Sequence, residues 1–277
     1  MELVSSIARW LHIIAGVMWI GLLYFFNFIN AHFAATLDGD SKKKVVPELM
    51  PRALYWFRWG AAWTWVTGIV LIGLVYHRGG LMFDDDYGWG ASAIIMTAVT
   101  FLAVFAYDYL YKTGLATNVR LITIISFVLI GATDYLMKEW AGFSYRAFNI
   151  HLGALFGTNM AFNVWFRIWP AQRKIITAIK NGEAPDSNLV ALAGLRSKHN
   201  TYMSVPLIWT MMNQHTIALA GGNFGITSST NWLVLMIVVA VGWHIVFQLY
   251  KKSGKIQGFL TNLIRSEFTL SVFDLTS

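Results

Sequence analysis

Long uncharged stretches alternate along the chain with short clusters of charged residues, a pattern typical of proteins that cross a membrane several times. No Asp, Glu, Lys or Arg occurs between Trp10 and Leu37, nor between Asn200 and Tyr250. The hydrocarbon core of a bilayer is about 30 Å thick, so a helix needs about 20 apolar residues to cross it. We therefore expect an all-α integral membrane protein, a bundle of about seven transmembrane helices. The helices are predicted near residues 6–33, 56–77, 89–111, 118–137, 146–169, 201–221 and 231–250.

The distribution of Lys and Arg predicts how this bundle is oriented in the membrane. Basic residues collect in cytoplasmic loops, whereas acidic residues contribute little to this asymmetry. In this chain, Lys and Arg concentrate after the first, third, fifth and seventh predicted helices, in residues 42–52, 112–120, 173–198 and 251–255. These segments share one side of a seven-helix bundle. The N-terminus is therefore predicted to lie outside and the C-terminus in the cytoplasm.

A single helical transmembrane domain, residues 1–258, is expected to account for most of the chain, with a short C-terminal tail at 259–277. Within this domain, 171–200 is predicted to be an inner loop that carries a short helix on the membrane surface. The reason is that Gln172–Ile179 places three isoleucines on one helical face. A tight hairpin around Gly221–Gly225 is predicted to join the last two helices.

The composition narrows the chemistry that the chain can carry. Apolar residues make up 56% of it and charged residues 13%, about half of the usual charged share. The chain contains no cysteine, which excludes disulfides, thiolate metal sites, iron–sulfur clusters and a c-type cytochrome domain within these residues. The net charge of +7 follows from the basic segments on one side of the bundle. We therefore expect the lipid bilayer, and no nucleic acid, as a partner.

Three histidines are predicted at nearly one depth, in the outer half of the membrane and on three different helices. His12 lies one turn inside the first helix. At 1.5 Å per residue, His151 lies about 7.5 Å inside the fifth helix and His215 about 9 Å inside the sixth. Asp134 of the fourth helix lies at the same level. Because ionisable side chains are costly inside a membrane, each of these residues is a candidate for function.

Histidines at one depth on facing helices suit a haem iron, which takes imidazole ligands inside helix bundles. We therefore expect a non-covalent b-type haem near the outer face, with His12 and His151 as the favoured iron ligands and His215 as a third cofactor-binding candidate. Gly16, one turn after His12, would let the ring approach the backbone, and Trp19 lies on the same helical face. A zinc or copper site is the less favoured metal hypothesis. The structural alternative is that each histidine forms a hydrogen bond to a neighbouring helix and packs there.

Two segments carry a resemblance to a known family. They are RWLHIIAGVMWIGLLYFFNF at 9–28 and PRALYWFRWGA at 51–61. Together they resemble the membrane domain of the bacterial membrane-bound urate oxidases that pass electrons to cytochrome c, over nearly the whole chain. The shorter pattern H-x-x-x-G-x-x-W-x-G-L-x-Y is also similar to the haem-dependent membrane protoporphyrinogen oxidases.

The resemblance implies an oxidoreductase of purine catabolism in the bacterial inner membrane, which hydroxylates urate to 5-hydroxyisourate and passes the electrons via haem to cytochrome c or another acceptor. Members often carry a C-terminal cytochrome c domain that this cysteine-free chain lacks, so the acceptor would be a separate protein. Because urate is an anion, Arg146, Asn149 and Arg9 are candidates to bind it, with Asp134 or His151 as the base. Two other functions stay open: a non-catalytic haem-binding or structural subunit of a respiratory or photosynthetic complex, and protoporphyrinogen oxidation.

Overall fold

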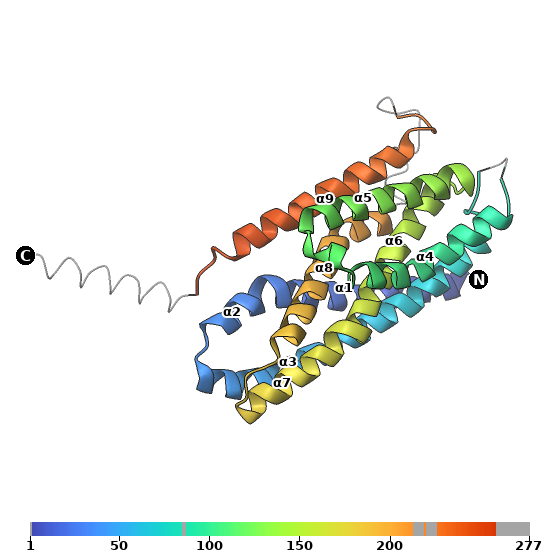
Figure 1. Ribbon diagram of the computed structural model, residues 1–277. Helices are drawn as coiled ribbons and strands as arrows, with labels where there is room; N and C mark the ends of the chain where they lie inside the picture. Colours follow the sequence, from blue (N-terminus) through green and yellow to red (C-terminus); the bar gives the residue numbers. More distant parts are fainter. Residues whose placement is uncertain (1, 85–86, 213–218, 220–225, 259–277) are drawn as a thin grey trace, which may run out of the picture.

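The computed structural model of the chain describes residues 2–84, 87–212, 219 and 226–258, and the regular structure in them is helical apart from one isolated β-bridge. Seven long helical rods follow one another along this part of the chain, several of them continued by short π-helical turns (Figure 1). The rods are α1–η1–α2 (Glu2–Tyr24, Phe25–Asn30 and Ala31–Thr36), α3–η2 (Gly39–Leu71 and Ile72–His77), α4 (Ala91–Leu110), α5–η4 (Val119–Tyr135 and Leu136–Trp140), α6–η5–α7 (Tyr145–Asn163, Val164–Ile168 and Trp169–Asn181), α8 (Ser187–Met211) and α9 (Asn231–Ser253). The predicted hairpin at Gly221–Gly225 and the tail at 259–277 lie outside the described residues.

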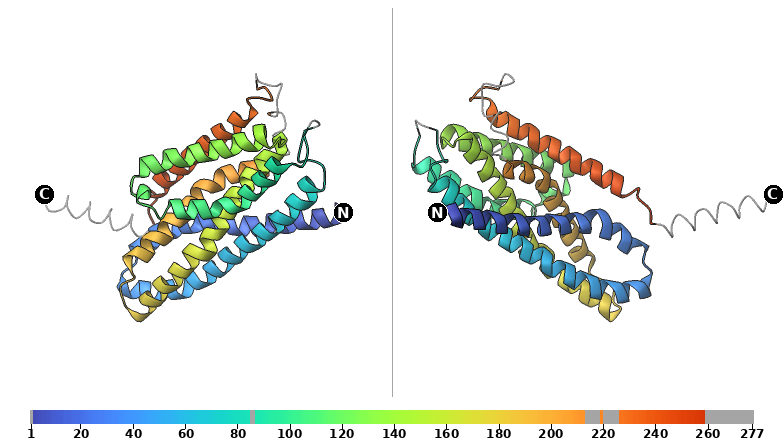
Figure 2. Two further views of the ribbon diagram at one scale, coloured as in Figure 1. Left: turned by 45° about the vertical axis from the view of Figure 1, so that its right-hand side comes forward. Right: turned by 180° about the vertical axis from the view of Figure 1, so that it is seen from behind.

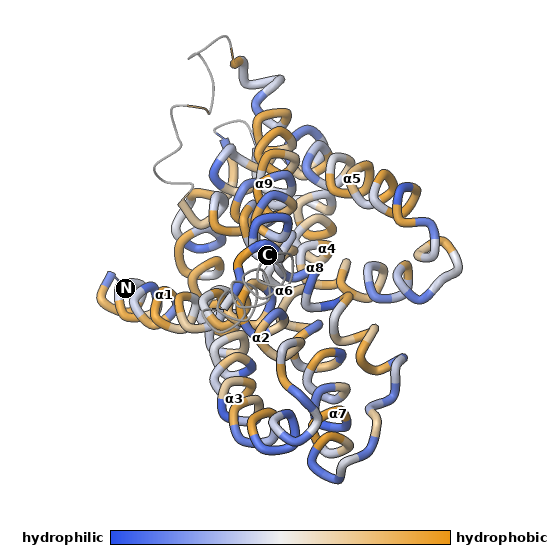
Figure 3. The backbone as a smooth tube through the Cα atoms, turned by 90° about the vertical axis from the view of Figure 1, so that its left-hand side faces the viewer, coloured by the Kyte–Doolittle hydropathy of each residue, from blue (hydrophilic) through white to orange (hydrophobic). Residues whose placement is uncertain are grey.

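Five of the rods in the described residues are long and apolar enough to cross a membrane: Glu2–Thr36, Gly39–His77, Ala91–Leu110, Val119–Trp140 and Asn231–Ser253. The prediction of an all-α membrane protein is confirmed. The other two rods are less apolar because they carry polar side chains that the bundle buries. These include Asn149, His151 and Asn163 on α6, and Arg196 and Asn200 on α8. Figure 3 shows the contrast, with apolar residues predominating along α1, α5 and α9.

The helix α6 lies inside the bundle, where 14 of its 19 residues are buried. It contacts α3, α4, α5, α8 and α9. The pair α1 and α3 lies on one flank, and α5 and α9 lie side by side on the opposite flank (Figures 1 and 2). This arrangement leaves the polar residues of α6 shielded from lipid, and it brings them next to side chains from several other helices.

Glycines allow the closest helix contacts, as is usual where helices associate in membranes. A Cβ atom at Gly60 of α3 would lie 3.2 Å from the backbone nitrogen of Trp19, so a side chain there would push α1 away. A Cβ atom at Gly153 of α6 would lie 2.0 Å from Oγ1 of Thr210 on α8. Both positions therefore require glycine at the present helix spacing.

The segment 171–200 differs from its prediction. α7 continues the rod of α6, and α8 begins soon after, so only residues 182–186 connect the two helices. The apolar face of α7 packs inside the protein rather than on the membrane surface. Ile175 forms a small satellite core with Ala193 of α8, and Ile176 joins the main core. An amphipathic helix needs an apolar surface for its hydrophobic face, and the first turns of α8 supply one within the chain.

Candidate functional site

A cavity of about 780 Å³ lies between α1, α3, α6 and α8, in the half of the bundle predicted to face outside. This volume is in the range of small-molecule and cofactor sites. Most of the wall is apolar, and glycines from three of the helices contribute to it. Residues on the wall include Arg9, His12, Gly16, Trp19, Gly68 and Gly157.

His12 is held against α3 by a hydrogen bond between its Nδ1 and Oγ1 of Thr67, at 3.1 Å. The ring rests on Gly68, where a Cβ atom would come within 3.1 Å of the imidazole Cε1. Thr67 in turn donates its hydroxyl to the carbonyl oxygen of Trp63, at 2.6 Å. Metal-binding histidines are commonly oriented in this way, with one ring nitrogen bonded to a neighbouring group and the other free for the metal. This hydrogen bond leaves Nε2 of His12 as the nitrogen that could bind an iron.

Two further residues that the sequence associates with His12 line the same cavity. Gly16 has only the side chain of Thr64 near its missing Cβ, at 3.8 Å, so this part of the wall is open. Trp19 is 1% exposed, and its indole Nε1 finds no hydrogen-bond partner in the part of the chain that the structure describes. Buried N–H groups usually have a hydrogen-bond acceptor, which here a ligand in the cavity could supply. The volume, the oriented histidine and the unpaired donor together fit a haem.

His151 does not line this cavity. Its ring is completely buried and pairs with His77 at the end of η2, with 3.2 Å between the two Nε2 atoms. The rings stack with centroids 5.5 Å apart. Nδ1 of His151 donates to the carbonyl oxygen of Ala147 at 2.7 Å, so in the neutral ring Nε2 must accept from His77. The structure therefore brings His151 to His77 and not to the cavity wall with His12.

His215 lies outside the described residues. Met211, the last residue of α8, lines the cavity. Among the described residues, no three His, Asp or Glu side chains come together closely enough to hold a metal ion. A zinc site of the usual three or four protein ligands is therefore not formed in this part of the chain.

The two predicted catalytic residues lie on neighbouring rods. Asp134, in the last turn of α5, has no exposed surface, and neither of its carboxylate oxygens has a hydrogen-bond partner within the described residues. Arg146 lies in the first turn of α6, which Ser144 caps by accepting from the backbone N–H of Ala147 at 3.2 Å. Asn149, one turn further, is buried and donates to the carbonyl oxygen of Tyr145. A buried carboxylate without a partner is costly, which marks Asp134 as a functional candidate.

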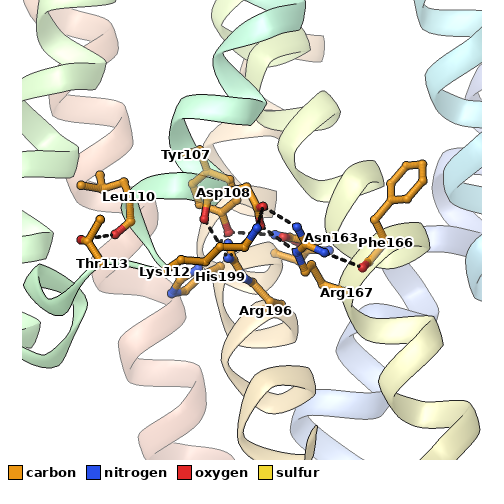
Figure 4. Close-up of polar contacts among 11 residues, drawn as sticks. Tyr107, Asp108, Leu110, Lys112, Thr113, Asn163, Phe166, Arg167, Arg196 and His199 are labelled. Carbon is orange, nitrogen blue, oxygen red and sulfur yellow. Dashed lines mark hydrogen bonds and ion pairs between the residues drawn. The ribbon is translucent and has the colours of Figure 1, made fainter. Parts of the chain in front are cut away.

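A second polar site, which the sequence did not reveal, lies where α4 ends. The carboxylate of Asp108 accepts from Nε of Arg167 at 2.8 Å and pairs with a second nitrogen of the same guanidinium. Nη2 of Arg196 lies 3.0 Å from Asp108, and Nζ of Lys112 lies 2.7 Å from it. Figure 4 shows these three cations converging on one carboxylate, from the turn after α4, from η5 and from α8. We call these four residues the Asp108 cluster.

Uncharged groups extend the Asp108 cluster into the bundle. The hydroxyl of Tyr107 lies 2.9 Å from Nδ1 of His199 and accepts from Nδ2 of Asn163 at 2.8 Å. The guanidinium of Arg196 lies over the ring of Tyr107, 5.0 Å from its centre. The amide of Asn163 also donates to Asn200 at 2.9 Å. The local signals of this site are the position of Asp108 inside the predicted 89–111 helix and its i, i+4 spacing to Lys112, whereas the two arginines come from distant parts of the chain.

Comparison with known protein families identifies the family of this chain. A profile of the urate oxidase N-terminal family matches residues 37–273. The chain belongs to this family. The matched region contains the 51–61 segment, α6 with His151, and the Asp108 cluster, whereas His12 lies ahead of it. The comparison gives no support to a relationship with protoporphyrinogen oxidases. Neither curated proteins nor solved structures provide a match to the chain.

Proposed function

We propose that the protein is a bacterial inner-membrane oxidoreductase that converts urate to 5-hydroxyisourate and passes the electrons, through a b-type haem, to a separate cytochrome c. The family match over residues 37–273 carries this proposal, because it connects a membrane bundle to urate oxidation. The apolar, glycine-lined cavity beside His12 supports the cofactor part. A position in the outer half of the bundle would suit an electron acceptor outside the membrane.

The chemistry defines what the protein must contribute. Urate and one water molecule give 5-hydroxyisourate, two protons and two electrons. The site must therefore hold a planar anion, accept protons and keep the substrate within reach of an electron acceptor. Arg9 is exposed and lines the cavity, so it offers a cation at the rim. We propose Arg146 as a second cation for the substrate and Asp134 as the base, since Asp134 is a buried carboxylate without a hydrogen-bond partner among the described residues.

In the proposed arrangement, Nε2 of His12 would hold the haem iron, and the hydrogen bond to Thr67 would keep the imidazole in the tautomer that this requires. The haem would supply one-electron steps between the substrate and the cytochrome. Trp19 would donate its indole N–H to an acceptor on the cofactor, and the glycine wall leaves room for a flat ring. His151 could bind a metal through Nε2 only without its present hydrogen bond to His77.

The test uses purified protein with urate and oxidised cytochrome c. We expect two cytochromes reduced per urate, because the carrier takes one electron at a time, and a Soret band that shifts on reduction. His12→Ala should lose the haem or its low-spin spectrum. The matched control is His244→Ala, since His244 is exposed on α9 and bonds only locally, to Gln248, in the structure described.

An artificial one-electron acceptor, used in place of cytochrome c, tests the substrate and the electron-accepting partner separately. Reduction of the dye but not of cytochrome c by urate would overturn the partner and leave the substrate in place. Haem-loaded protein that reduces neither acceptor when urate is added would overturn urate oxidation itself. Full haem content in His12→Ala would overturn the ligand assignment.

A further inference from the structure

The Asp108 cluster carries more positive charge than its carboxylate can balance. Arg167, Arg196 and Lys112 contribute three positive charges against one negative, which leaves a formal charge of +2. Arg196 is 1% exposed, and its Nε and Nη1 atoms have no hydrogen-bond partner within the described residues. The surplus is therefore not neutralised by the part of the chain that the structure describes.

Two of the three cations reach the surface of the bundle. The side chain of Lys112 is 55% exposed and that of Arg167 is 24% exposed, whereas Arg196 is enclosed. Lys112 follows the last turn of α4, and Arg167 lies in η5, so the two approach Asp108 from neighbouring rods (Figure 4). Nζ of Lys112 has three donors, of which the ion pair with Asp108 uses one. The exposed side of the cluster can thus donate to a ligand.

The surface next to these cations is aromatic and exposed. Phe105, Tyr109 and Phe166 are 62%, 72% and 60% exposed, which in a membrane bundle means contact with lipid. Phe162 links Phe105 and Phe166, with ring centroids 6.2 Å and 4.9 Å away. The guanidinium of Arg167 lies over the ring of Phe162, 5.3 Å from its centre. The positive charge therefore lies at one end of an apolar strip that faces the bilayer.

A ligand for this surface must be an anion at one end and apolar at the other. Basic pockets between transmembrane helices on the cytoplasmic side are the usual places where anionic lipid headgroups bind. The cluster lies on the side that the distribution of Lys and Arg predicts to be cytoplasmic. We propose that Lys112 and Arg167 bind the phosphate of an anionic phospholipid, with its acyl chains along Phe105 and Phe166. Asp108 holds both cations in position, and the inference is independent of urate oxidation.

The test measures lipid binding to the purified full-length chain by native mass spectrometry, with phosphatidylglycerol and phosphatidylcholine as the probes. The wild-type chain should bind phosphatidylglycerol about tenfold or more tightly than phosphatidylcholine. Lys112→Ala should reduce this preference several-fold, and Lys112→Arg should keep most of it. The matched control is Arg52→Ala, because Arg52 is a 71% exposed cation paired with Glu48 in the same i, i+4 spacing.

Inorganic phosphate distinguishes a lipid from a free anion. If millimolar phosphate displaces phosphatidylglycerol completely, or if Phe166→Ala leaves its affinity unchanged, the site binds phosphate alone and the lipid assignment is wrong. Equal binding of the two lipids by the wild-type chain would overturn the proposal. So would a full preference in a folded Lys112→Ala variant.

Discussion

Replacing Asp108 by Asn removes the negative charge that holds three cationic side chains together. The carboxylate is 7% exposed, and its most deeply enclosed partner, Arg196, is 1% exposed. Asn has nearly the same volume as Asp and can still accept a hydrogen bond, so the substitution tests the charge rather than the packing. The guanidinium of Arg196 would remain buried with no counter-ion among its described neighbours.

The size of the effect follows from the burial of each pair. Removing one partner of a buried ion pair costs about 3–5 kcal/mol, because the other charge is left without compensation. The Lys112 pair contributes less than about 1 kcal/mol of this, since its amine is half exposed and water can replace the carboxylate. We therefore expect Asp108→Asn to lower the free energy of unfolding by about 3 kcal/mol, with Arg196 responsible for most of the loss.

Unfolding by SDS in mixed micelles, followed by circular dichroism, measures this difference. Glu48→Gln is the control, because it removes the partner of Arg52 where both side chains are 71% exposed, and it should cost less than about 1 kcal/mol. The double variant Asp108→Asn with Arg196→Met should recover part of the loss, since the uncompensated charge is gone. Two results would refute the reasoning. One is a loss in Asp108→Asn no larger than that in Glu48→Gln. The other is a double variant that is clearly less stable than Asp108→Asn alone.

Three other predictions follow from the helix contacts and the charge distribution. His77→Ala leaves the buried Nε2 of His151 without its hydrogen-bond donor, so we expect the free energy of unfolding to fall by about 1–3 kcal/mol in the same assay. The haem spectrum should stay unchanged. Loss of the haem would instead make His77 and His151 part of the cofactor site. Gly153→Val should separate α6 from α8 and lower the free energy of unfolding by about 1–3 kcal/mol or more. Gly21→Val is the control, because a Cβ atom at Gly21 would meet no neighbouring atom within 4 Å, and it should change this free energy little. A reporter fused at residue 255 should be active only as a cytoplasmic reporter, and periplasmic activity there would mean that the predicted number of spans is wrong.

The class of the protein and the positions of most of its helices can be read from the hydropathy of the chain. A bilayer requires long apolar helices, so their positions can be recognised from hydropathy alone. The prediction for 89–111 differs from α4, Ala91–Leu110, by one or two residues at each end. The prediction for the second helix began at 56, whereas α3 begins at Gly39, because its first turns carry charged residues that hydropathy assigns to a loop. The prediction for the sixth helix began at 201, whereas α8 begins at Ser187, because Arg196 and Lys198 interrupt the apolar stretch.

In the candidate site too, some features could be predicted from the sequence and others depend on helix packing. The depth of a residue along a helix follows from its distance to the helix end, so His12, Gly16 and Trp19 could be associated from their spacing, and all three line the cavity. Rotation about the helix axis and the choice of neighbours are decided only by packing. His151 is predicted at the depth of His12 from its distance to the helix end, yet its ring contacts His77 at the end of η2, whereas that of His12 contacts Thr67 of α3.

The Asp108 cluster shows this limit most clearly. The sequence places an Asp within a predicted transmembrane helix, which signals that a counter-charge must exist, but it does not identify the residue that supplies it. Arg167 and Arg196 are 59 and 88 positions away along the chain. They meet Asp108 because α6 passes between α4 and α8, and because a buried carboxylate is stable only where folding brings cations to it.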